Sequence, residues 1–200
     1  MGKEHGVQIG YSGADLTNPD AIEEMMAYVT ADFGGTDILV NNAGTQFVSP
    51  LEEFPVAKWD LIMALNLSAA FHTTRMAIGP MKEKGWGRII NTGSAHAKVA
   101  SPFKSAYVAA KHGLSGLTKV TALEGAEHGV RCNLVCPGYV HTPLVDGQID
   151  DTAKARGMTR DEVVKNVLLA AQPTKEFVTA EQIGGFVAFL CSPDADFFFF

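Results

Sequence analysis

Short apolar runs alternate along the chain with longer stretches in which apolar side chains recur every three or four residues. The runs at residues 7–10, 37–41, 88–92 and 130–136 have the length and residue types of strands. The run at 37–41 is continuous, which is typical of a strand buried on both faces. Residues 19–33, 58–81 and 105–128 show helical spacing instead, and the last of these stretches stops before Gly129.

The helix expected after residue 18 has the clearest boundaries. Asn18 is a suitable N-cap and Pro19 suits the first helical position, while Gly34 and Gly35 suit the end. Between them, apolar residues fall at the i, i+3, i+4 and i+7 positions of one face: Ile22, Met25, Met26 and Val29.

Alternation of strands and helices predicts parallel strands joined by helical crossovers. We therefore expect an α/β fold with a doubly wound parallel sheet, as one domain over residues 1–200, because no repeat or linker divides the chain. Residues 142–175 break the alternation and are rich in Asp, Lys and Arg. Because ligands bind beyond the carboxyl ends of parallel strands, this excursion is expected to be an active-site lid, with an ordinary surface insertion as the alternative.

Composition narrows the function classes. The net charge is −6 and the basic residues form no cluster, so neither nucleic acid nor an anionic membrane is an expected partner. No stretch approaches the roughly 20 apolar residues that span a bilayer, and no apolar run follows the first residues as in a secretory signal. A cytoplasmic location is therefore expected. Neither the histidines nor the cysteines have metal-ligand spacing, so no metal is expected, and Cys132, Cys136 and Cys191 are interpreted as buried reduced thiols.

Candidate chemistry lies at Ser94, Tyr107 and Lys111. The tyrosine and the lysine are one helical turn apart, and an ammonium near a phenol favours the phenolate. We expect the lysine to lower the tyrosine pKa, so that the tyrosine can exchange a proton with a substrate oxygen that the serine also holds. A solvated surface pair is the alternative for Tyr-x-x-x-Lys taken alone. A hydride acceptor would still have to be a cofactor.

Three further segments strengthen the functional interpretation. Asn41-Asn42-Ala43-Gly44 follows one expected strand, Ser94 the next, and Pro137-Gly138 the one after. The carboxyl ends of parallel strands meet at one edge of a sheet, so these segments are expected to lie together.

On these motifs the chain resembles the short-chain dehydrogenases/reductases over nearly its whole length. The resemblance implies a Rossmann-like fold and NAD as the cofactor. It also implies Tyr107 as the acid/base, Ser94 as the group that orients the substrate oxygen, and Lys111 as ribose ligand and pKa tuner. Asn66 matches the asparagine that holds a water linked to that lysine. The implied cofactor-binding residues, besides Tyr107 and Lys111, are Asp15, Leu16, Asn42, Ala43, Gly44, Pro137, Gly138, Val140 and Thr142.

Within the family, the resemblance is to the subgroup that oxidises D-3-hydroxybutyrate to acetoacetate with NAD. Its small carboxylate substrate is bound by residues that correspond here to Gln46, His96, Lys104 and Gln148, besides Ser94 and Tyr107. Each of the four has an ordinary alternative as a surface, loop or turn residue. Tyr139 stands where the subgroup usually has tryptophan. A reductase of the same family that acts on a 3-oxoacyl thioester or a polyol is the alternative within the enzyme class.

Both ends of the chain depart from the family pattern. No Gly-x-x-x-Gly-x-Gly turn is present, and the chain opens at what resembles the family's third strand. We therefore expect a chain truncated at both ends, lacking the first β-α-β unit and the last strand, with the preference for NAD inferred from the subgroup alone. The final residues 197–200, all phenylalanine, are interpreted as a truncation or cloning artefact or a frayed end. The family implies a homotetramer, and a non-catalytic fragment that serves as an interaction domain is the remaining alternative.

Overall fold

The computed structural model of the chain describes residues 2–199, apart from the side chains of Lys3 and Leu144. Its centre is a parallel sheet in which β1 (Ile38–Asn41), β2 (Gly87–Thr92) and β3 (Val130–Val135) lie side by side in chain order. The register pairs Ile89 of β2 with Leu39 and with Cys132. All three strands therefore end at the same edge of the sheet.

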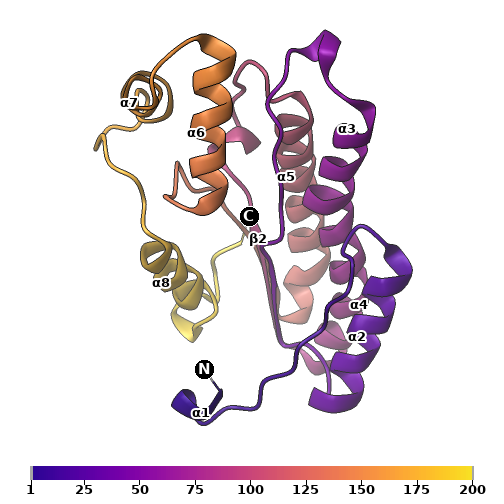
Figure 1. Cartoon of the computed structure of the whole chain (residues 1–200). Coiled ribbons are helices and arrows are strands. Elements are labelled where there is room, and N and C mark those ends of the chain that lie inside the picture. The colour runs from indigo at the N-terminus through magenta and orange to yellow at the C-terminus, as the bar shows by residue number, and fades with distance from the viewer. Residues whose placement is uncertain (1, 200) are drawn as a thin grey trace.

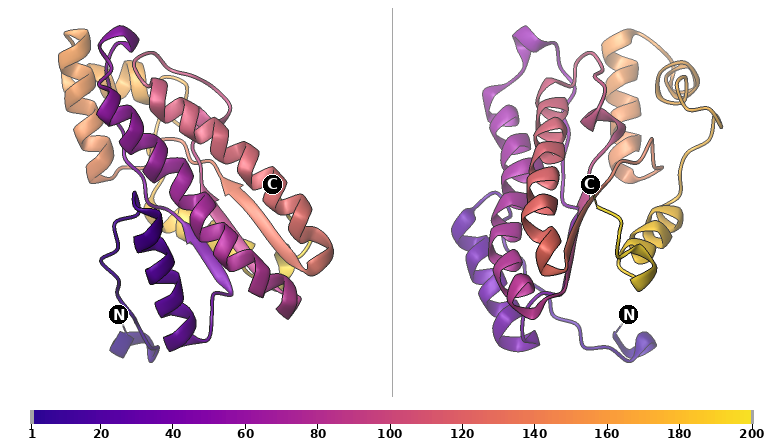
Figure 2. Two further views of the ribbon diagram at one scale, coloured as in Figure 1. Left: turned by 90° about the vertical axis from the view of Figure 1, so that its right-hand side faces the viewer. Right: turned by 180° about the vertical axis from the view of Figure 1, so that it is seen from behind.

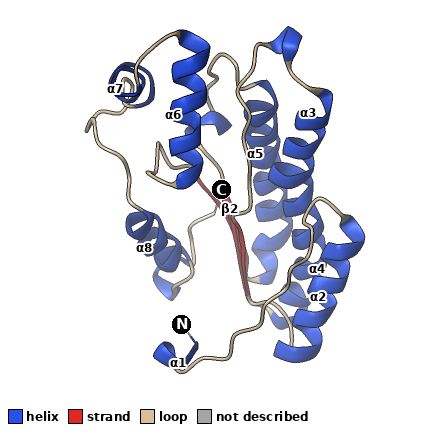
Figure 3. Ribbon diagram, viewed as in Figure 1, coloured by secondary structure: helices blue, strands red, loops and turns tan. Residues whose placement is uncertain are grey.

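Helices cover both faces of the sheet, as Figures 1 and 2 show. On one face, Ile89 packs with residues of α2 (Pro19–Phe33), α4 (Ala69–Lys84) and α5 (Ser105–Gly125). On the other, Ile90 packs with α8 (Ala180–Leu190) through Leu190. Because successive side chains of a strand point to opposite faces, the adjacent isoleucines anchor two separate cores. The expected α/β class with a parallel sheet is confirmed (Figure 3).

Most expected helix boundaries are confirmed. Asn18 caps α2, its Oδ1 accepting a hydrogen bond of 3.0 Å from the Asp20 amide, and Gly34 ends the helix with φ 80°. The second expected helix is α3 (Val56–Met63) and α4, joined without a break by a π-helical turn at Ala64–Ser68. After α5, a 3-10 turn at Ala126–His128 leads to Gly129, whose φ is 72°.

Two expectations at the sheet's edge are wrong. Residues 7–10 form no strand, and Val7 and Ile9 are exposed. The strand β1 is not buried on both faces, since Ile38 and Val40 are 46% and 45% exposed. The reason is that, among the described residues, β1 pairs only with β2, so it is an edge strand. An apolar sequence indicates strand propensity, but a strand is buried only where other elements pack against it. A short helix, α1 (Gly2–His5), precedes this region.

The excursion after β3 has its own helices and its own core. It contains α6 (Pro143–Arg156), α7 (Arg160–Val163) and a π-helical turn at Val164–Leu168. Where the sequence predicted only a charged break in the alternation, α6 has 14 residues, held by burial of Val145 and Ile149 against Val163. At the base, the Val178 amide donates a 2.9 Å hydrogen bond to the Tyr139 carbonyl, which ties the two ends of the excursion together.

The carboxyl-terminal segment lies along the sheet and is not frayed over residues 196–198. After α8 and a 3-10 turn at Pro193–Ala195, the Asp196 carboxylate pairs with the buried Arg88 of β2. Asn133 of β3 donates a 3.1 Å hydrogen bond to the Phe198 carbonyl. Phe197 is nevertheless 90% exposed. Phe200 lies outside the described residues.

The three cysteines are free thiols, and only Cys132 is buried, so the expectation of burial is wrong for Cys136 and Cys191, which are partly exposed. Cys136 follows the end of β3 and Cys191 follows α8, so neither is enclosed by an element on both sides. Within residues 2–199, no helix is long and apolar enough to cross a membrane.

Candidate active site

Ser94, Tyr107 and Lys111 come together where the strands end. Ser94 lies two residues beyond β2 in an extended conformation, and α5 carries Tyr107 and Lys111 on one face. The Lys111 Nζ donates a 2.6 Å hydrogen bond to the Thr92 carbonyl and lies 5.6 Å from the centre of the Tyr107 ring. Lys111 is buried, and burial lowers its pKa to about 8.

The Tyr107 phenol has a pKa above its ordinary value in this structure. Burial raises the pKa, and a hydrogen bond with Ser94 opposes that rise. The expectation that Lys111 lowers this pKa is therefore wrong for the protein alone. The Lys111 ammonium donates to the Thr92 carbonyl, and burial is the largest cause of the Tyr107 pKa shift.

His96 packs against the tyrosine and completes this side of the site. Its ring meets the Tyr107 ring edge-on, with 5.9 Å between centres. One ring nitrogen lies 2.9 Å from the Ser101 hydroxyl and the other 3.4 Å from the Ser94 hydroxyl. Burial, with the nearby Lys104 charge, lowers the His96 pKa to about 4. The imidazole is therefore neutral near pH 7, where it can act only as a neutral hydrogen-bonding group.

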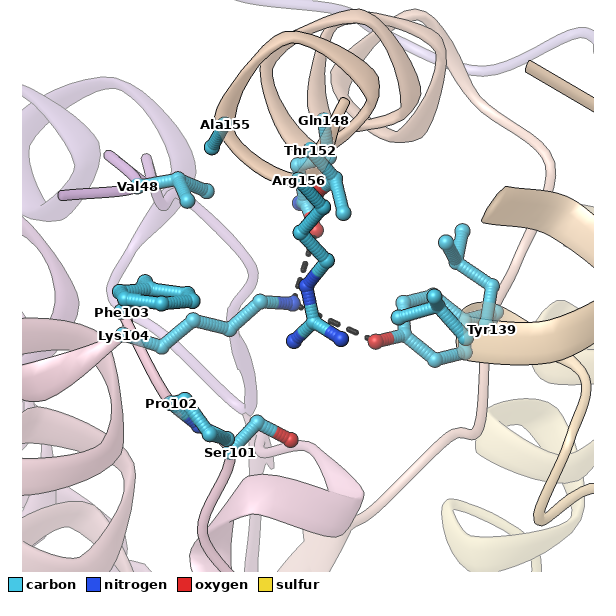
Figure 4. A pocket seen from close by; sticks show the side chains of 12 residues that line it. Val48, Ser101, Pro102, Phe103, Lys104, Tyr139, Gln148, Thr152, Ala155 and Arg156 are labelled. Atoms are coloured by element: carbon cyan, nitrogen blue, oxygen red, sulfur yellow. Dashed lines mark hydrogen bonds between the residues drawn. The ribbon is translucent and has the colours of Figure 1, made fainter. Parts of the chain in front are cut away.

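Lys104 brings a buried positive charge to the same region. Residue 104 is the N-cap position of α5 and the side chain is only 8% exposed. Its Nζ donates hydrogen bonds to the Tyr139 hydroxyl at 3.3 Å and to Gln148 Oε1 of α6 at 3.2 Å (Figure 4). Burial first, and then the charge of Arg156, lower the Lys104 pKa to about 8. Both partners are neutral, so within residues 2–199 the ammonium has hydrogen bonds but no counter-ion.

A cavity of about 730 Å³ joins these groups. It lies between the strand ends, the excursion and α8, and its volume is in the usual range for a small-molecule or cofactor site. Most residues that the sequence assigned to the site line it: Asn42, Gly44, Ser94, His96, Lys104, Tyr107, Lys111, Pro137, Gly138, Tyr139, Val140, Thr142 and Gln148. Their individual roles stay predictions.

Five assigned residues do not line this cavity. Asp15 is solvent-exposed and its carboxylate accepts from the amide and hydroxyl of Thr17, which lowers its pKa. Leu16 packs against the core below the sheet, and Ala43 is exposed. The roles assigned to these residues also stay predictions.

The other two, Asn66 and Gln46, are held in the segment behind the cavity. Asn66 lies in the π-helical turn, where its amide pairs with the Thr45 backbone in both directions, at 2.8 and 2.9 Å. Both polar atoms of the Gln46 side chain are buried and have no hydrogen-bond partner among the described residues. Such an orphaned amide is costly in a folded protein, and a polar ligand would satisfy it.

The sequence interpretation missed the apolar wall of the cavity. Val145, Leu168, Ile183 and Val187 line the side opposite the strand ends, together with Gln172. Ile183 and Val187 are one helical turn apart, so the periodicity of α8 was a usable signal. Leu168 and Gln172 carried no signal, because they lie in the irregular end of the excursion.

This arrangement suits proton exchange with an oxygen next to a bound anion. Ser94 and Tyr107 present hydroxyls at one part of the cavity, and Lys104 presents a cation at another. No group of side chains in residues 2–199 has the composition and placement of a metal site. Lys111 and the Pro137-Gly138 turn line the same cavity, whose whole volume is in the range of cofactor sites.

Comparison with known proteins agrees with this geometry. The sequence model described as short chain dehydrogenase matches residues 1–153. The D-beta-hydroxybutyrate dehydrogenase of Rhizobium meliloti (strain 1021) is 61% identical over 182 residues, 91% of this chain and 70% of that protein. The enzyme of the same name from Cupriavidus necator is 52% identical over 190 residues, 95% of this chain and 74% of that protein.

Among solved structures, an NAD+-bound xylitol dehydrogenase superposes with a TM-score of 0.92 at 28% identity, covering 98% of this chain and 78% of that one. The Rossmann-like architecture expected from the sequence is thereby confirmed. With its parallel sheet, its Ser94–Tyr107–Lys111 constellation and these relatives, the chain belongs to the short-chain dehydrogenase family of oxidoreductases.

Proposed function

We propose that the protein transfers a hydride between NAD and a small 3-hydroxy acid, oxidising D-3-hydroxybutyrate reversibly to acetoacetate. One observation carries the choice of substrate. Lys104 is a buried cation with only neutral partners, and it lines the same cavity as Ser94 and Tyr107. A buried charge is unfavourable until an opposite charge reaches it, so the site favours a carboxylate.

The substrate's carboxylate would complete a prearranged set of donors. Lys104 supplies the positive charge, and Gln148 and Tyr139 hold the ammonium in place from α6 and from the loop after β3. Hydrogen bonds between ionised groups are about twice as strong as neutral ones. Gln46 lies two residues after Gly44 in the sequence. Its side-chain amide, which has no partner among the described residues, would gain one if a ligand oxygen reached it.

Proton exchange falls to Tyr107. The phenol donates its proton to the ketone oxygen during reduction and accepts the proton of the hydroxyl during oxidation. Ser94 holds the same oxygen through its hydroxyl while charge changes there. Because burial raises the Tyr107 pKa, the neutral phenol dominates near pH 7 in the protein alone, which is the form that reduction needs. Oxidation needs the phenolate and is therefore favoured at higher pH.

The cofactor supplies the hydride acceptor, since no side chain can take a hydride. The residues that would hold it line the part of the cavity away from Lys104, namely Asn42, Gly44, Lys111, Pro137, Gly138, Val140 and Thr142. Lys111 would donate to a ribose hydroxyl from its position beside Thr92. The NAD+-bound xylitol dehydrogenase supports a nicotinamide cofactor, and the preference for NAD over NADP rests on the resemblance to the hydroxybutyrate-oxidising subgroup.

We further propose a cytoplasmic homo-oligomer, a tetramer as in the family. Apolar side chains on the outer surfaces of α4 and α5 support assembly, since Phe71 is 47%, Val120 53% and Leu123 66% exposed. Burial of such residues against a second copy would remove them from water.

The test is turnover with NAD and D-3-hydroxybutyrate, followed by the absorbance of NADH, in the protein and in Lys104→Gln. Lys119→Gln, which removes a charge from an exposed site on α5, is the matched control. We expect Lys104→Gln to raise KM for the acid about tenfold or more, because a charge-assisted contact is lost, and the control to be unchanged. A 3-oxoacyl thioester reduced equally well by both proteins, with no turnover of the acid, would instead establish the alternative substrate class.

A further inference from the structure

A second, smaller pocket opens beside Lys104, and Tyr107 does not line it. Its volume is about 40 Å³, enough for a few small polar atoms, and it shares Lys104, Tyr139, Gln148 and Leu168 with the large cavity. Figure 4 shows a second cation in this pocket, because the Arg156 side chain descends from α6 with its guanidinium toward the end of the Lys104 side chain. Two positive groups from different parts of the chain therefore face one space.

Neither cation has an acidic partner within residues 2–199. Lys104 donates only to Tyr139 and Gln148, and Arg156 makes a cation–π contact of 5.7 Å with the Phe103 ring. Arg160 shows the contrast, since it pairs with both Asp146 and Asp150. The excursion thus has acidic residues available, and none of them is placed at Arg156.

The backbone beneath this pocket is held in an uncommon conformation. Phe103 has φ 70°, in the left-handed region that non-glycine residues rarely adopt. Its carbonyl is fixed by a 3.0 Å hydrogen bond from the Ser49 amide, and its ring lies under Arg156. Strained residues of this kind persist where surrounding structure enforces them, commonly around binding sites. Here the strain directs Phe103 to Arg156 and the next residue, Lys104, to the cavity.

We infer that Arg156 is a second carboxylate-binding cation of the proposed site, and that it holds α6 over the cavity only when an anion lies between it and Lys104. This inference rests on the proposed function, because it needs a carboxylate substrate at Lys104. It assigns to the excursion a specificity role, in which the lid selects an acid and rejects its neutral counterpart.

The electrostatics favour such a dependence on the ligand. Without an anion, like charges on α6 and at the start of α5 repel each other, and the Arg156 charge contributes to lowering the Lys104 pKa. An intervening carboxylate turns both contacts into attractive, charge-assisted ones. The hydrogen bond from Lys104 to Gln148 joins α6 to the N-cap of α5, so a change at this point acts directly on the position of α6. A ligand with different affinity for the open and closed arrangements shifts their populations.

The experiment measures acetoacetate binding without cofactor, by titration calorimetry and by hydrogen–deuterium exchange of residues 143–156. The variants are Arg156→Gln, Arg156→Lys and the matched control Lys154→Gln, which removes one charge from the same turn of α6 without touching either pocket. Acetoacetamide, with the same skeleton and no charge, is the neutral comparator. Arg156 and Lys154 are both exposed, so the variants should fold, which circular dichroism checks.

We expect acetoacetate to slow exchange in α6 of the unaltered protein and of Lys154→Gln. In Arg156→Gln its affinity should fall about tenfold and the protection should be lost, with acetoacetamide unaffected and Arg156→Lys intermediate. Equal binding and protection in Arg156→Gln, with binding abolished in Lys104→Gln, would overturn the role of Arg156 and leave the proposed function standing. An unaltered protein that binds acetoacetate no better than acetoacetamide would overturn both.

Discussion

Replacing Lys104 with methionine should make the unliganded protein more stable. Lys104 is 8% exposed, its ammonium has only neutral partners among the described residues, and it faces the Arg156 charge. Methionine has a similar length and volume and carries no charge to desolvate. The substitution therefore separates the contribution of this side chain to binding from its cost to folding.

The magnitude follows from the pKa. A lowering from 10.5 to about 8 corresponds to about 3 kcal/mol of unfolding free energy lost at pH 7, at about 1.4 kcal/mol per pKa unit. The lost hydrogen bonds to Tyr139 and Gln148 offset about 1 kcal/mol, because both partners line the cavity and can find other donors. A net gain of about 2 kcal/mol remains, which would raise Tm by about 4–8 °C in a chain of this size.

The assay is urea unfolding followed by circular dichroism at pH 7 and pH 10, with Lys119→Met as the exposed control. Between about pH 8 and 10.5 the unfolded chain keeps the Lys104 proton that the folded protein has lost. The unfolded state then binds more protons, so raising the pH stabilises the protein that has Lys104. Lys104→Met lacks this contribution. Its advantage should therefore be largest at pH 7 and nearly vanish at pH 10.

Two results would refute the reasoning. A loss of stability on Lys104→Met at pH 7 would mean that the hydrogen bonds outweigh desolvation. A gain of equal size at both pH values would mean that the effect comes from packing and not from the charge. The control variant should change stability by less than about 0.5 kcal/mol, as exposed substitutions usually do.

Three further predictions concern other parts of the site and its support. Tyr107→Phe should lower turnover by about 10²–10⁴-fold while calorimetry shows unchanged acetoacetate affinity, and near-normal turnover would exclude Tyr107 as the acid/base. Gly129→Ala should lower the free energy of unfolding by at least about 2 kcal/mol, because φ is 72° and a Cβ would lie 2.1 Å from the Gly85 carbonyl oxygen. A smaller loss in urea unfolding would show that this contact is not crowded. Asn66→Ala should lower the free energy of unfolding by about 2 kcal/mol, because both hydrogen bonds to the Thr45 backbone are lost. Hydrogen exchange at residues 43–46 should become faster, and unchanged exchange there would show that Asn66 does not hold this segment.

Local patterns predicted the helices well, because capping and amphipathic spacing act within a few residues. Asn18 begins α2 by capping it with its side chain, and Gly34 ends the helix because its backbone adopts a left-handed conformation. Burial of a strand is a property of its neighbours, so the apolar run of β1 did not reveal that Ile38 and Val40 are exposed. The charged sequence of residues 142–175 did not reveal α6 either, because Arg160 pairs with Asp146 and Asp150 of that helix only in the folded excursion.

Some features of the candidate site were likewise predictable from the sequence and others were not. Motif positions such as Ser94 and Tyr107 were predictable because they follow strand ends in order. The direction of the Tyr107 pKa shift was not predictable, because it depends first on the depth of burial in the folded protein. Arg156 also gave no signal, since its approach to Lys104 spans two elements and depends on an unusual φ at Phe103.

The closed base of the excursion has a consequence for how substrate range can change. The Tyr139–Val178 hydrogen bond joins the ends of this segment, and its helices bury their own apolar residues. Residues 140–178 thus enter and leave the fold at one point, so a replacement of different size or charge there would leave the sheet intact while changing the Gln148–Lys104 and Arg156–Phe103 contacts. Recombination at that junction, more than point substitution within the sheet, offers this scaffold a short route to new acids.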